Sequence, residues 1–429
     1  MPAYTGSRGF PLPRPLPRPR LPLVPLPLVL LAATAPGLAE GFRSPTAGTH
    51  GLGASGGRLA FLQDASAATH NPANLVDLAR WEVAAEPTFV HHAATFTAPS
   101  GATTRTREPW KVLPSFFAGG PLDAGRLAAG VGLHAPYGLA LDWEPDGPLR
   151  GVAPFLTELR TLNVNPSLAF RLAEGLNAAA GLNTLWSELR FQQVYPWSAA
   201  TGVAGLPDGE LRARGDGLGW GGNFALTWEI AARHRLAATV RSPMDVDYQG
   251  RFGVTSVPTL GFGELATPLA TAIRFPTIVS LGYGVRVTDS VLLEAGGEWL
   301  QFSRFQSLDL EVEGSLPGLV TRLPQAWRDT FTAGFSARWE FAPGWQLRGG
   351  YQHFQTPVPE ATLSPLIPDA RQNVVTAGLG WRTGRHRLDL AYSRVFYEDR
   401  QTTTTWNPGF VGRYEIDAHL MSAGYGFSF

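Results

Sequence analysis

The segment Trp327-Arg-Asp-Thr-Phe-Thr-Ala-Gly-Phe-Ser-Ala-Arg-Trp-Glu-Phe341 decides the fold. Its odd-numbered positions hold every aromatic residue, from Trp327 to Phe341, and its even-numbered positions hold Arg, Thr, Gly, Ser and Glu. A helix would scatter the aromatic side chains around its circumference, whereas a strand gathers them on one face. We therefore predict a strand with an aromatic face toward an apolar medium and a polar face on the other side.

Two other segments alternate in the same way. In the first, Leu162, Val164, Leu168 and Phe170 alternate with Asn163, Asn165, Ser167 and Arg171. In the second, Val279, Leu281, Tyr283, Val285 and Val287 alternate with Ser280, Gly282, Gly284 and Arg286. The pattern is therefore general, and it indicates a sheet with one apolar and one mixed face.

The C-terminal segment Ser422-Ala-Gly-Tyr-Gly-Phe-Ser-Phe429 also has aromatic residues at a spacing of two. Tyr425, Phe427 and Phe429 lie on one face of the predicted last strand. The segment resembles the C-terminal signal by which outer-membrane β-barrels are recognised for insertion.

Connection lengths support a membrane barrel. Short turns are predicted at 121–125, 173–175, 231–234, 288–290, 342–344 and 383–385, and long polar loops near 98–108, 138–157, 193–216, 250–274, 304–326, 357–370 and 399–413. Short and long connections alternate strictly, as in bacterial barrels with short periplasmic turns and long extracellular loops, and the segments give about fourteen strands. A soluble sandwich or propeller has no reason to sort its loops in this way.

The composition agrees with this architecture and excludes several function classes. Charged residues make up 16% of the chain and the formal net charge is +0, so nothing favours a nucleic-acid partner. There is no cysteine, which excludes disulfides, thiolate metal sites and cysteine nucleophiles.

The N-terminal region differs from the rest of the chain. Residues 1–39 read as a secretory signal, with a basic region, an apolar stretch from Leu21 to Ala33 and a small-x-small cleavage site at Gly37-Leu38-Ala39. A Pro/Arg-rich leader with a later translation start is the alternative. Residues 40–80 contain small residues and helix-compatible stretches, and we predict that they form a helical hatch. The barrel is then expected over residues 81–429.

The predicted hatch carries the clearest resemblance to a known family. Gly51-Leu52-Gly53, the Asp64-Ala65-Ser66 stretch and Asn71-Pro72-Ala73 resemble the hatch of the outer-membrane long-chain fatty acid transporter family (FadL/TodX). Further matches follow in the expected order at Asn165-Pro166-Ser167, Phe275-Pro276, Trp327-Arg328-Asp329, Leu347-Arg348-Gly349-Gly350-Tyr351, Thr356-Pro357-Val358-Pro359, Ile367-Pro368-Asp369-Ala370-Arg371 and Leu388-Asp389-Leu390. The likeness extends from about Glu40 to Phe429.

The resemblance implies an all-β, transmembrane antiparallel barrel of fourteen strands, closed by the hatch, that takes up hydrophobic molecules passively. In that family a kink in the third strand opens the wall sideways. The corresponding segment here is Leu127 to Tyr137, in which Gly130, Gly132 and Pro136 could break the ladder. Ordinary barrel curvature is the alternative explanation of these residues.

The candidate ligand-binding and gating residues are Phe42, Asn71, Pro72, Ala73, Gly130, Gly132, Pro136 and Arg190. Arg190 lies in the fifth predicted strand, where relatives place a basic ligand-binding residue, and an arginine fork suits a carboxylate. Arg160, Arg328, Arg348 and Arg371 are further candidates. Structural pairing with Glu188, Glu294 or Glu298 is the competing role for any of these arginines.

The predicted function is uptake of long-chain fatty acids across the outer membrane of a Gram-negative-type bacterium. Uptake of aromatic or alkane hydrocarbons is the alternative, and a lipid-acting enzyme or a structural barrel would belong to other classes. We find no G-x-S-x-G, HExxH or P-loop motif, and the adjacent His91 and His92 point to opposite faces of a strand. We therefore expect a monomer without catalytic residues, metal or cofactor, with a hydrophobic ligand and membrane lipid as its partners.

Overall fold

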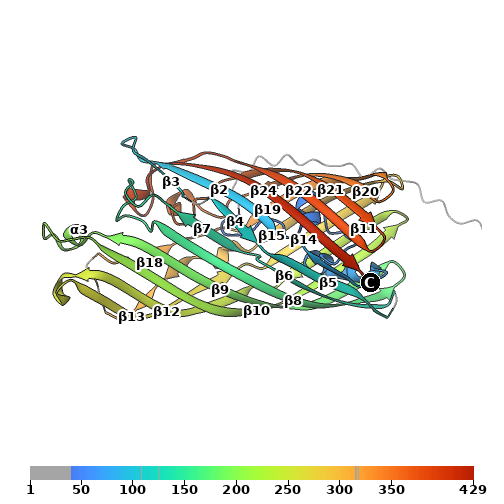
Figure 1. The fold of residues 1–429 in the computed structure, drawn as a ribbon, viewed down its shortest axis with the longest axis horizontal. Coiled ribbons are helices and arrows are strands. Elements are labelled where there is room, and N and C mark those ends of the chain that lie inside the picture. The colour runs from blue at the N-terminus through green and yellow to red at the C-terminus, as the bar shows by residue number, and fades with distance from the viewer. Residues whose placement is uncertain (1–39, 108, 124, 315, 317) are drawn as a thin grey trace, which may run out of the picture. The chain divides into compact units, whose positions relative to one another are not determined.

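The computed structural model describes residues 40–107, 109–123, 125–314, 316 and 318–429. The predicted signal at 1–39 lies outside these residues. The described chain is a closed antiparallel barrel of fourteen wall strands around a small N-terminal hatch (Figure 1). Among the described residues, no helix is long and apolar enough to cross a membrane.

The hatch contains the first three short helices, the wall is built of strand segments, and the other five short helices lie in the connections between wall strands. The helices are α1 (Thr49–Gly53), α2 (Ala67–His70), η1 (Pro72–Asp77), α3 (Trp197–Thr201), η2 (Pro258–Leu260), η3 (Phe302–Arg304), η4 (Glu360–Thr362) and η5 (Pro408–Phe410). The strands of the first half are β1 (Glu82–Ala85), β2 (Thr88–Thr97), β3 (Thr103–Arg105), β4 (Trp110–Leu113), β5 (Ser115–Asp123), β6 (Leu127–His134), β7 (Gly138–Asp142), β8 (Leu156–Ala173), β9 (Leu176–Tyr195), β10 (Gly209–Ala231), β11 (His234–Arg241) and β12 (Met244–Val257). Those of the second half are β13 (Gly263–Phe275), β14 (Ile278–Arg286), β15 (Val291–Leu300), β16 (Ser307–Asp309), β17 (Glu311–Val312), β18 (Arg322–Pro324), β19 (Thr330–Ala342), β20 (Trp345–Phe354), β21 (Gln372–Thr383), β22 (His386–Tyr397), β23 (Arg400–Thr402) and β24 (Gly412–Ser428).

The barrel closes where the first wall strand meets the last. Glu82 of β1 pairs with Ser428 of β24, and Thr88 of β2 pairs with Ser422 of the same strand. This closure leaves no free sheet edge around the wall.

Several wall strands are divided into two segments, and a proline lies in or beside each division. Pro87 separates β1 from β2, Pro114 separates β4 from β5, Pro136 separates β6 from β7, Pro243 separates β11 from β12, and Pro276 separates β13 from β14. Proline donates no ladder hydrogen bond, so regular pairing stops at these positions. The divisions at Pro243 and Pro276 lie side by side, because Met244 pairs with Phe275.

The predicted faces of β19 are confirmed. Phe331 and Phe335 are 61% and 59% exposed on the outer wall, whereas Thr332 and Ser336 are buried toward the lumen. Trp327 does not belong to the predicted outward row, because it precedes β19 and lies fully buried inside the barrel.

The short turns are found where the sequence predicts them, but the predicted long loop 250–274 is mostly strand and the loop predicted at 193–216 is shortened at both ends by strand. β9 continues to Tyr195, β10 begins at Gly209, and β12 and β13 leave only residues 258–262 between them. Charged residues on the outer face are typical of loops, but strands that continue past the lipid keep their pairing and change only the side chains on their outer face. Arg160, Glu188 and Asp216 mark this change at one level, since Glu188 pairs with both of the others.

Candidate functional site

Asn71, Pro72 and Ala73 attach the hatch to the wall at the junction of α2 and η1. The Asn71 side chain is fully buried, and its Oδ1 accepts a hydrogen bond from the Ala73 backbone N–H at 3.2 Å. Its Nδ2 donates to the Thr227 hydroxyl of β10 at 2.8 Å. Pro72 occupies the first turn of η1, where its fixed φ suits a helix start. The motif therefore fixes the turn between α2 and η1 and also hydrogen-bonds the hatch to β10 of the wall.

Gly130 and Gly132 face the hatch from β6. A Cβ atom at Gly130 would lie 2.8 Å from Leu75 Cδ1, and one at Gly132 would lie 2.0 Å from Thr69 Oγ1. Both glycines lie in the regularly paired part of β6, which matches β5 from Leu127 to His134. Their role in this structure is to make room for the hatch, while the break lies farther along the strand.

The predicted interruption of the third wall strand is at Pro136. β6 ends at His134 and β7 begins at Gly138, although both pair with β8. The hatch supplies the missing partner on the other edge: the Ser44 N–H donates to the Pro136 carbonyl at 3.0 Å, and the Gly138 N–H donates to the Phe42 carbonyl at 2.8 Å. The start of the hatch thus seals the break with backbone hydrogen bonds.

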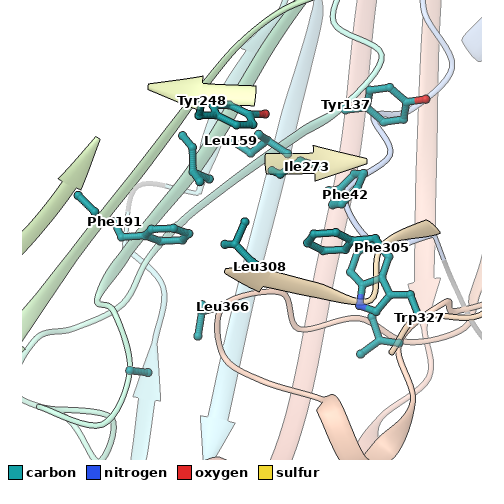
Figure 2. Packing of buried hydrophobic residues seen from close by; sticks show 14 of the residues in the cluster. Phe42, Tyr137, Leu159, Phe191, Tyr248, Ile273, Phe305, Leu308, Trp327 and Leu366 are labelled. Carbon is teal, nitrogen blue, oxygen red and sulfur yellow. The ribbon is translucent and has the colours of Figure 1, made fainter. Parts of the chain in front are cut away.

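Phe42 is the centre of an aromatic cluster in the extracellular half of the lumen. It is 1% exposed, and its ring centroid lies 4.9–5.8 Å from the centroids of five neighbouring rings, with Trp327 at 4.9 Å and Phe275 at 5.4 Å. Tyr137, Phe302 and Phe305 complete the set of rings around it. We call these five rings the aromatic cage; aliphatic side chains such as Leu308 and Ile273 extend it (Figure 2). A hatch side chain therefore fills the apolar interior.

A small cavity of about 100 Å³ adjoins the cage beside the strand break. Arg43 and Arg58 line it and are paired with Glu298 at 2.8 and 3.3 Å. Arg241 also lines it; its Nη2 donates to the Thr69 carbonyl at 3.1 Å, and no described carboxylate pairs with it. This cavity thus has a cation that is not neutralised by a described neighbour.

Other polar groups at the cavity also have unused hydrogen-bonding capacity. The Tyr137 hydroxyl, the His134 Nδ1 and the Thr69 hydroxyl are buried without a hydrogen-bond partner among the described residues. Buried polar groups are normally paired, and an unpaired one costs about 1–3 kcal/mol. The cavity is therefore prepared for a polar group that brings acceptor atoms.

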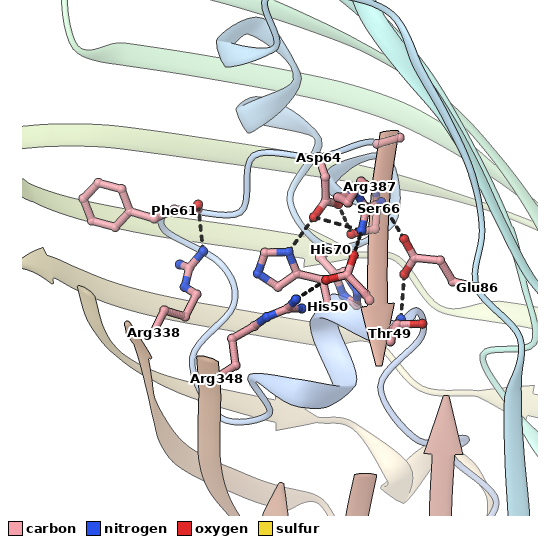
Figure 3. Close-up of polar contacts among 12 residues, drawn as sticks. Thr49, His50, Phe61, Asp64, Ser66, His70, Glu86, Arg338, Arg348 and Arg387 are labelled. Carbon is pink, nitrogen blue, oxygen red and sulfur yellow. Dashed lines mark hydrogen bonds and ion pairs between the residues drawn. The ribbon is translucent and has the colours of Figure 1, made fainter. Parts of the chain in front are cut away.

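The periplasmic half of the lumen is closed by ion pairs instead of rings. Arg387 of β22 contacts Glu82 at 2.9 Å and Glu86 at 2.7 Å, and also pairs with Asp389. The hatch enters the network through His50, whose Nδ1 lies 2.6 Å from Asp64 Oδ2 (Figure 3). Burial, helped by the nearby Arg348 charge, lowers the pKa of His50 to about 4. His50 is therefore neutral at pH 7.

A second set of contacts connects the hatch backbone to the wall in the periplasmic half of the lumen. Glu294 of β15 accepts hydrogen bonds from the backbone N–H groups of Ala60 and Phe61 at 3.0 and 3.2 Å and pairs with Arg338. Arg338 also donates to the Phe61 carbonyl at 3.2 Å (Figure 3). We call these contacts and those of Arg387 the charged lock.

The structure corrects the choice of Arg190. This residue shares the outer face of β9 with the exposed Trp186, and it pairs with Glu158 at 2.9 Å. It lies on the opposite side of the wall from the lumen, because its neighbours Leu189 and Phe191 face the cage and successive residues of a strand point to opposite faces. Of the other candidates, Arg160 is also outside, Arg348 is paired with Asp389, and Arg371 is paired with Glu398.

Sequence reasoning missed Arg43, Arg241 and Asp369. Arg241 ends β11 immediately before the Pro243 division, and Arg43 follows the hatch residue Phe42. The sequence does show an arginine beside a proline that divides a strand. Whether the arginine side chain faces the lumen or the exterior depends on the strand register, which is set only in the assembled wall.

Comparison with known proteins covers most of the chain. Residues 29–429 match the family model described as "Outer membrane protein transport protein (OMPP1/FadL/TodX)". A long-chain fatty acid transport protein of Escherichia coli O6:H1 is 22% identical over 375 residues, which is 80% of this chain and 83% of that protein.

Solved structures share the fold at low sequence identity. A Pseudomonas aeruginosa FadL homologue superposes with a TM-score of 0.80 at 21% identity, covering 91% of this chain and 100% of that one. The P. putida toluene transporter TodX gives a TM-score of 0.74 at 18% identity, covering 89% and 98%.

Proposed function

Because the chain belongs to the OMPP1/FadL/TodX family of bacterial outer membrane proteins, which transport hydrophobic compounds, we propose that its own cargo is a long-chain fatty acid. The observation that carries this proposal is the cavity beside the aromatic cage. It combines the unneutralised Arg241 with the unpaired Tyr137 hydroxyl. A fatty acid has the matching chemistry, with an apolar tail for the cage and a carboxylate for the cavity.

The polar end of the cargo determines where it binds. A carboxylate accepts hydrogen bonds only, and an arginine fork can donate two of them to it. Arg241, the Tyr137 hydroxyl and the Thr69 hydroxyl can all donate into the cavity. An uncharged hydrocarbon would leave these donors unpaired, so the cavity favours the acid.

The apolar tail requires Phe42 to move. Ligand cavities for molecules of this size are about 300–1,000 Å³, and the present cavity is about 100 Å³. Withdrawal of Phe42 would join the cavity to the cage, and the tail would take over the ring contacts. Burying the tail stabilises the complex by roughly 25 cal/mol per Å² of apolar area, which does not require an external energy source.

Hydrocarbon uptake is the second candidate, and the rings around Phe42 favour it. Aromatic rings attract one another edge to face beyond their area burial, and four of the Phe42 contacts have this geometry. An aromatic hydrocarbon could take the place of the Phe42 ring and make the same edge-to-face contacts.

The test compares oleate with toluene on two matched variants. Arg241→Gln removes the lumen cation, and Arg190→Gln removes an arginine on the outer face as a control. We expect Arg241→Gln to weaken oleate binding about 10- to 100-fold, as for loss of a charged hydrogen bond, with toluene binding and the control unchanged.

Two results would decide against the proposal. An equal loss for oleate and toluene in Arg241→Gln would reject the carboxylate role. Binding of toluene but not oleate by the unmodified protein would favour the hydrocarbon as cargo.

A further inference from the structure

A second cavity, of about 290 Å³, lies beside the charged lock at the periplasmic end of the lumen. His50 and Phe61 of the hatch line it, together with residues of the short turns between β14 and β15 and between β19 and β20. Its charged lining consists of five arginines and three acids: Arg286, Arg338, Arg348, Arg382 and Arg387, with Asp289, Glu340 and Asp389. This cavity is separate from the one beside the aromatic cage, and its lining is rich in hydrogen-bond donors.

Two of these arginines have buried N–H groups without acceptors. Arg348 pairs with Asp389 through Nη2, but its Nε and Nη1 have no hydrogen-bond partner among the described residues. The Nε of Arg338 is likewise buried and unpaired, although its other nitrogens bind Glu294 and the Phe61 carbonyl. Both arginines are 5% exposed. Buried N–H groups are normally paired, so these three nitrogens require acceptor atoms that the described chain does not supply.

Arg286 adds a positive charge to the same cavity. None of the described carboxylates forms an ion pair with it, and its guanidinium stacks on Phe61, with 4.9 Å between Cζ and the ring centroid. An arginine that stacks on a ring face keeps the N–H groups at its edge free to donate. Of the acids in the lining, Asp389 and Asp289 are already in ion pairs, and Glu340 is exposed to solvent. Arg286 can therefore bind an anion.

His50 supplies an acceptor atom instead of a donor. Its Nδ1 lies 2.6 Å from Asp64 Oδ2, so the proton of the neutral ring is on Nδ1 and is donated to that carboxylate. The Nε2 atom then carries a lone pair, and it is buried without a partner among the described residues. Figure 3 shows the His50 ring between Arg338 and Arg348. The cavity thus combines several N–H donors with one acceptor.

We propose that this cavity binds hydrogen phosphate from the periplasm. The phosphate oxygens accept hydrogen bonds from Arg286, Arg338 and Arg348, and the P–OH group donates to His50 Nε2. Guanidinium groups match the geometry of phosphate oxygens. Sulfate and carboxylates have acceptor oxygens but no hydroxyl at neutral pH, and a phosphate monoester loses its P–OH proton above a pKa of about 6. The acceptor on His50 therefore favours inorganic phosphate.

Bound phosphate would strengthen the charged lock. It would join His50 of the hatch to three wall strands, because Arg286 lies in β14, Arg338 in β19 and Arg348 in β20. A ligand that binds only this closed arrangement stabilises it in proportion to its concentration. Periplasmic phosphate would thereby oppose opening of the lower half of the lumen, whichever cargo the protein carries.

Calorimetry on the full chain in nonionic detergent at pH 7.5, in a chloride buffer, tests the ligand. Inorganic phosphate, sulfate and glycerol 3-phosphate are titrated separately. We expect one phosphate to bind per chain, at least tenfold more tightly than either of the other anions, because only phosphate satisfies His50 Nε2. Equal affinity for sulfate would overturn the role of the P–OH group, and equal affinity for glycerol 3-phosphate would overturn the choice of the free ion.

Two variants and a matched control test the site. Arg286→Gln should weaken phosphate binding at least tenfold, as for loss of a charged hydrogen bond. Gln346→Glu should have a similar effect, because it places a negative charge in the cavity lining without a change in size. It covers the case in which Arg286→Gln does not fold. The control is Arg385→Gln, which makes the same change of charge at an exposed position of the turn between β21 and β22 and should bind phosphate normally.

Hydrogen exchange tests the effect on the lock. The backbone N–H groups of Ala60 and Phe61, which donate to Glu294, should exchange about tenfold more slowly when phosphate is present at ten times its Kd. Arg286→Gln should remove this protection at the same phosphate concentration. No heat of phosphate binding, an equal loss of affinity in Arg385→Gln, or exchange rates unaffected by phosphate would overturn the proposal. None of these measurements uses a cargo molecule, so their failure would leave the fatty acid proposal in place.

Discussion

The two halves of the lumen are closed by different kinds of interaction. The extracellular half is filled by rings and aliphatic side chains around Phe42, whereas the periplasmic half is held by Arg387, Arg338 and their carboxylate partners. Apolar contacts are non-directional, so another apolar molecule can replace Phe42 at little cost in free energy. Ion pairs cannot be replaced in this way, because an apolar molecule would leave buried charges unpaired. We therefore expect entry of the cargo and opening of the lower half to be separate steps.

The largest expected effect concerns the charged lock. Arg387→Leu would leave Glu82, Glu86, Asp64 and Asp389 without their shared cation, which should destabilise the closed hatch by about 3–5 kcal/mol. We expect ion conductance in planar bilayers from a barrel that still shifts on unboiled gels. Arg150→Leu, in an exposed pair with Asp146, is the control and should stay sealed. A sealed Arg387→Leu barrel would show that the rings alone can close the lumen.

An intermediate effect is expected from the aromatic cage. Phe42→Ala removes a buried ring, whose loss costs about 3 kcal/mol in a packed core, and it removes the side chain with which the cargo competes. Ligand affinity should therefore rise tenfold or more by calorimetry, without ion conductance, since the charged lock is intact. Conductance in this variant would mean that the two halves open together.

The smallest expected effect is a pH dependence of the charged lock. The pKa of His50 is lowered from its unfolded value of 6.5 to about 4. The unfolded state therefore binds more protons between these values, and stability falls as the pH drops through 6.5. His50→Gln should remove about 1 kcal/mol of the destabilisation measured at pH 5.5 relative to pH 7.5. Parallel pH profiles for the two proteins would exclude His50 from the effect.

The wall was predictable because its signals are local. The alternation around Phe331 and the short turns depend on residues close in sequence, so parity and turn chemistry reveal them. The hatch motif at Asn71 was recognisable for the same reason, although its partner Thr227 was not.

The candidate site was less predictable because it is assembled from distant segments. Arg241 and Arg43 meet only after the hatch enters the barrel, and Asp369 reaches Gly41 from a loop more than 300 residues away. The strand number of Arg190 does not determine which face of the strand it occupies, and a shift of one position separates the lumen from the exterior. Trp327 follows the alternating pattern of the strand, but it lies just before β19 begins at Thr330.

The lengths of β8, β9 and β10 have a consequence for where the protein meets its cargo. These strands have 18, 20 and 23 residues, against 12 each for β21 and β22. At about 3.3 Å per residue and a tilt of about 40°, β10 rises roughly 55–60 Å, about twice the hydrocarbon thickness. The outward charges that begin at Arg160, Glu188 and Asp216 fit a wall that stands in water above that level. One side of the barrel therefore extends beyond the headgroups, and we expect this extension to present the protein to cargo in the surrounding medium before that cargo can dissolve in the bilayer.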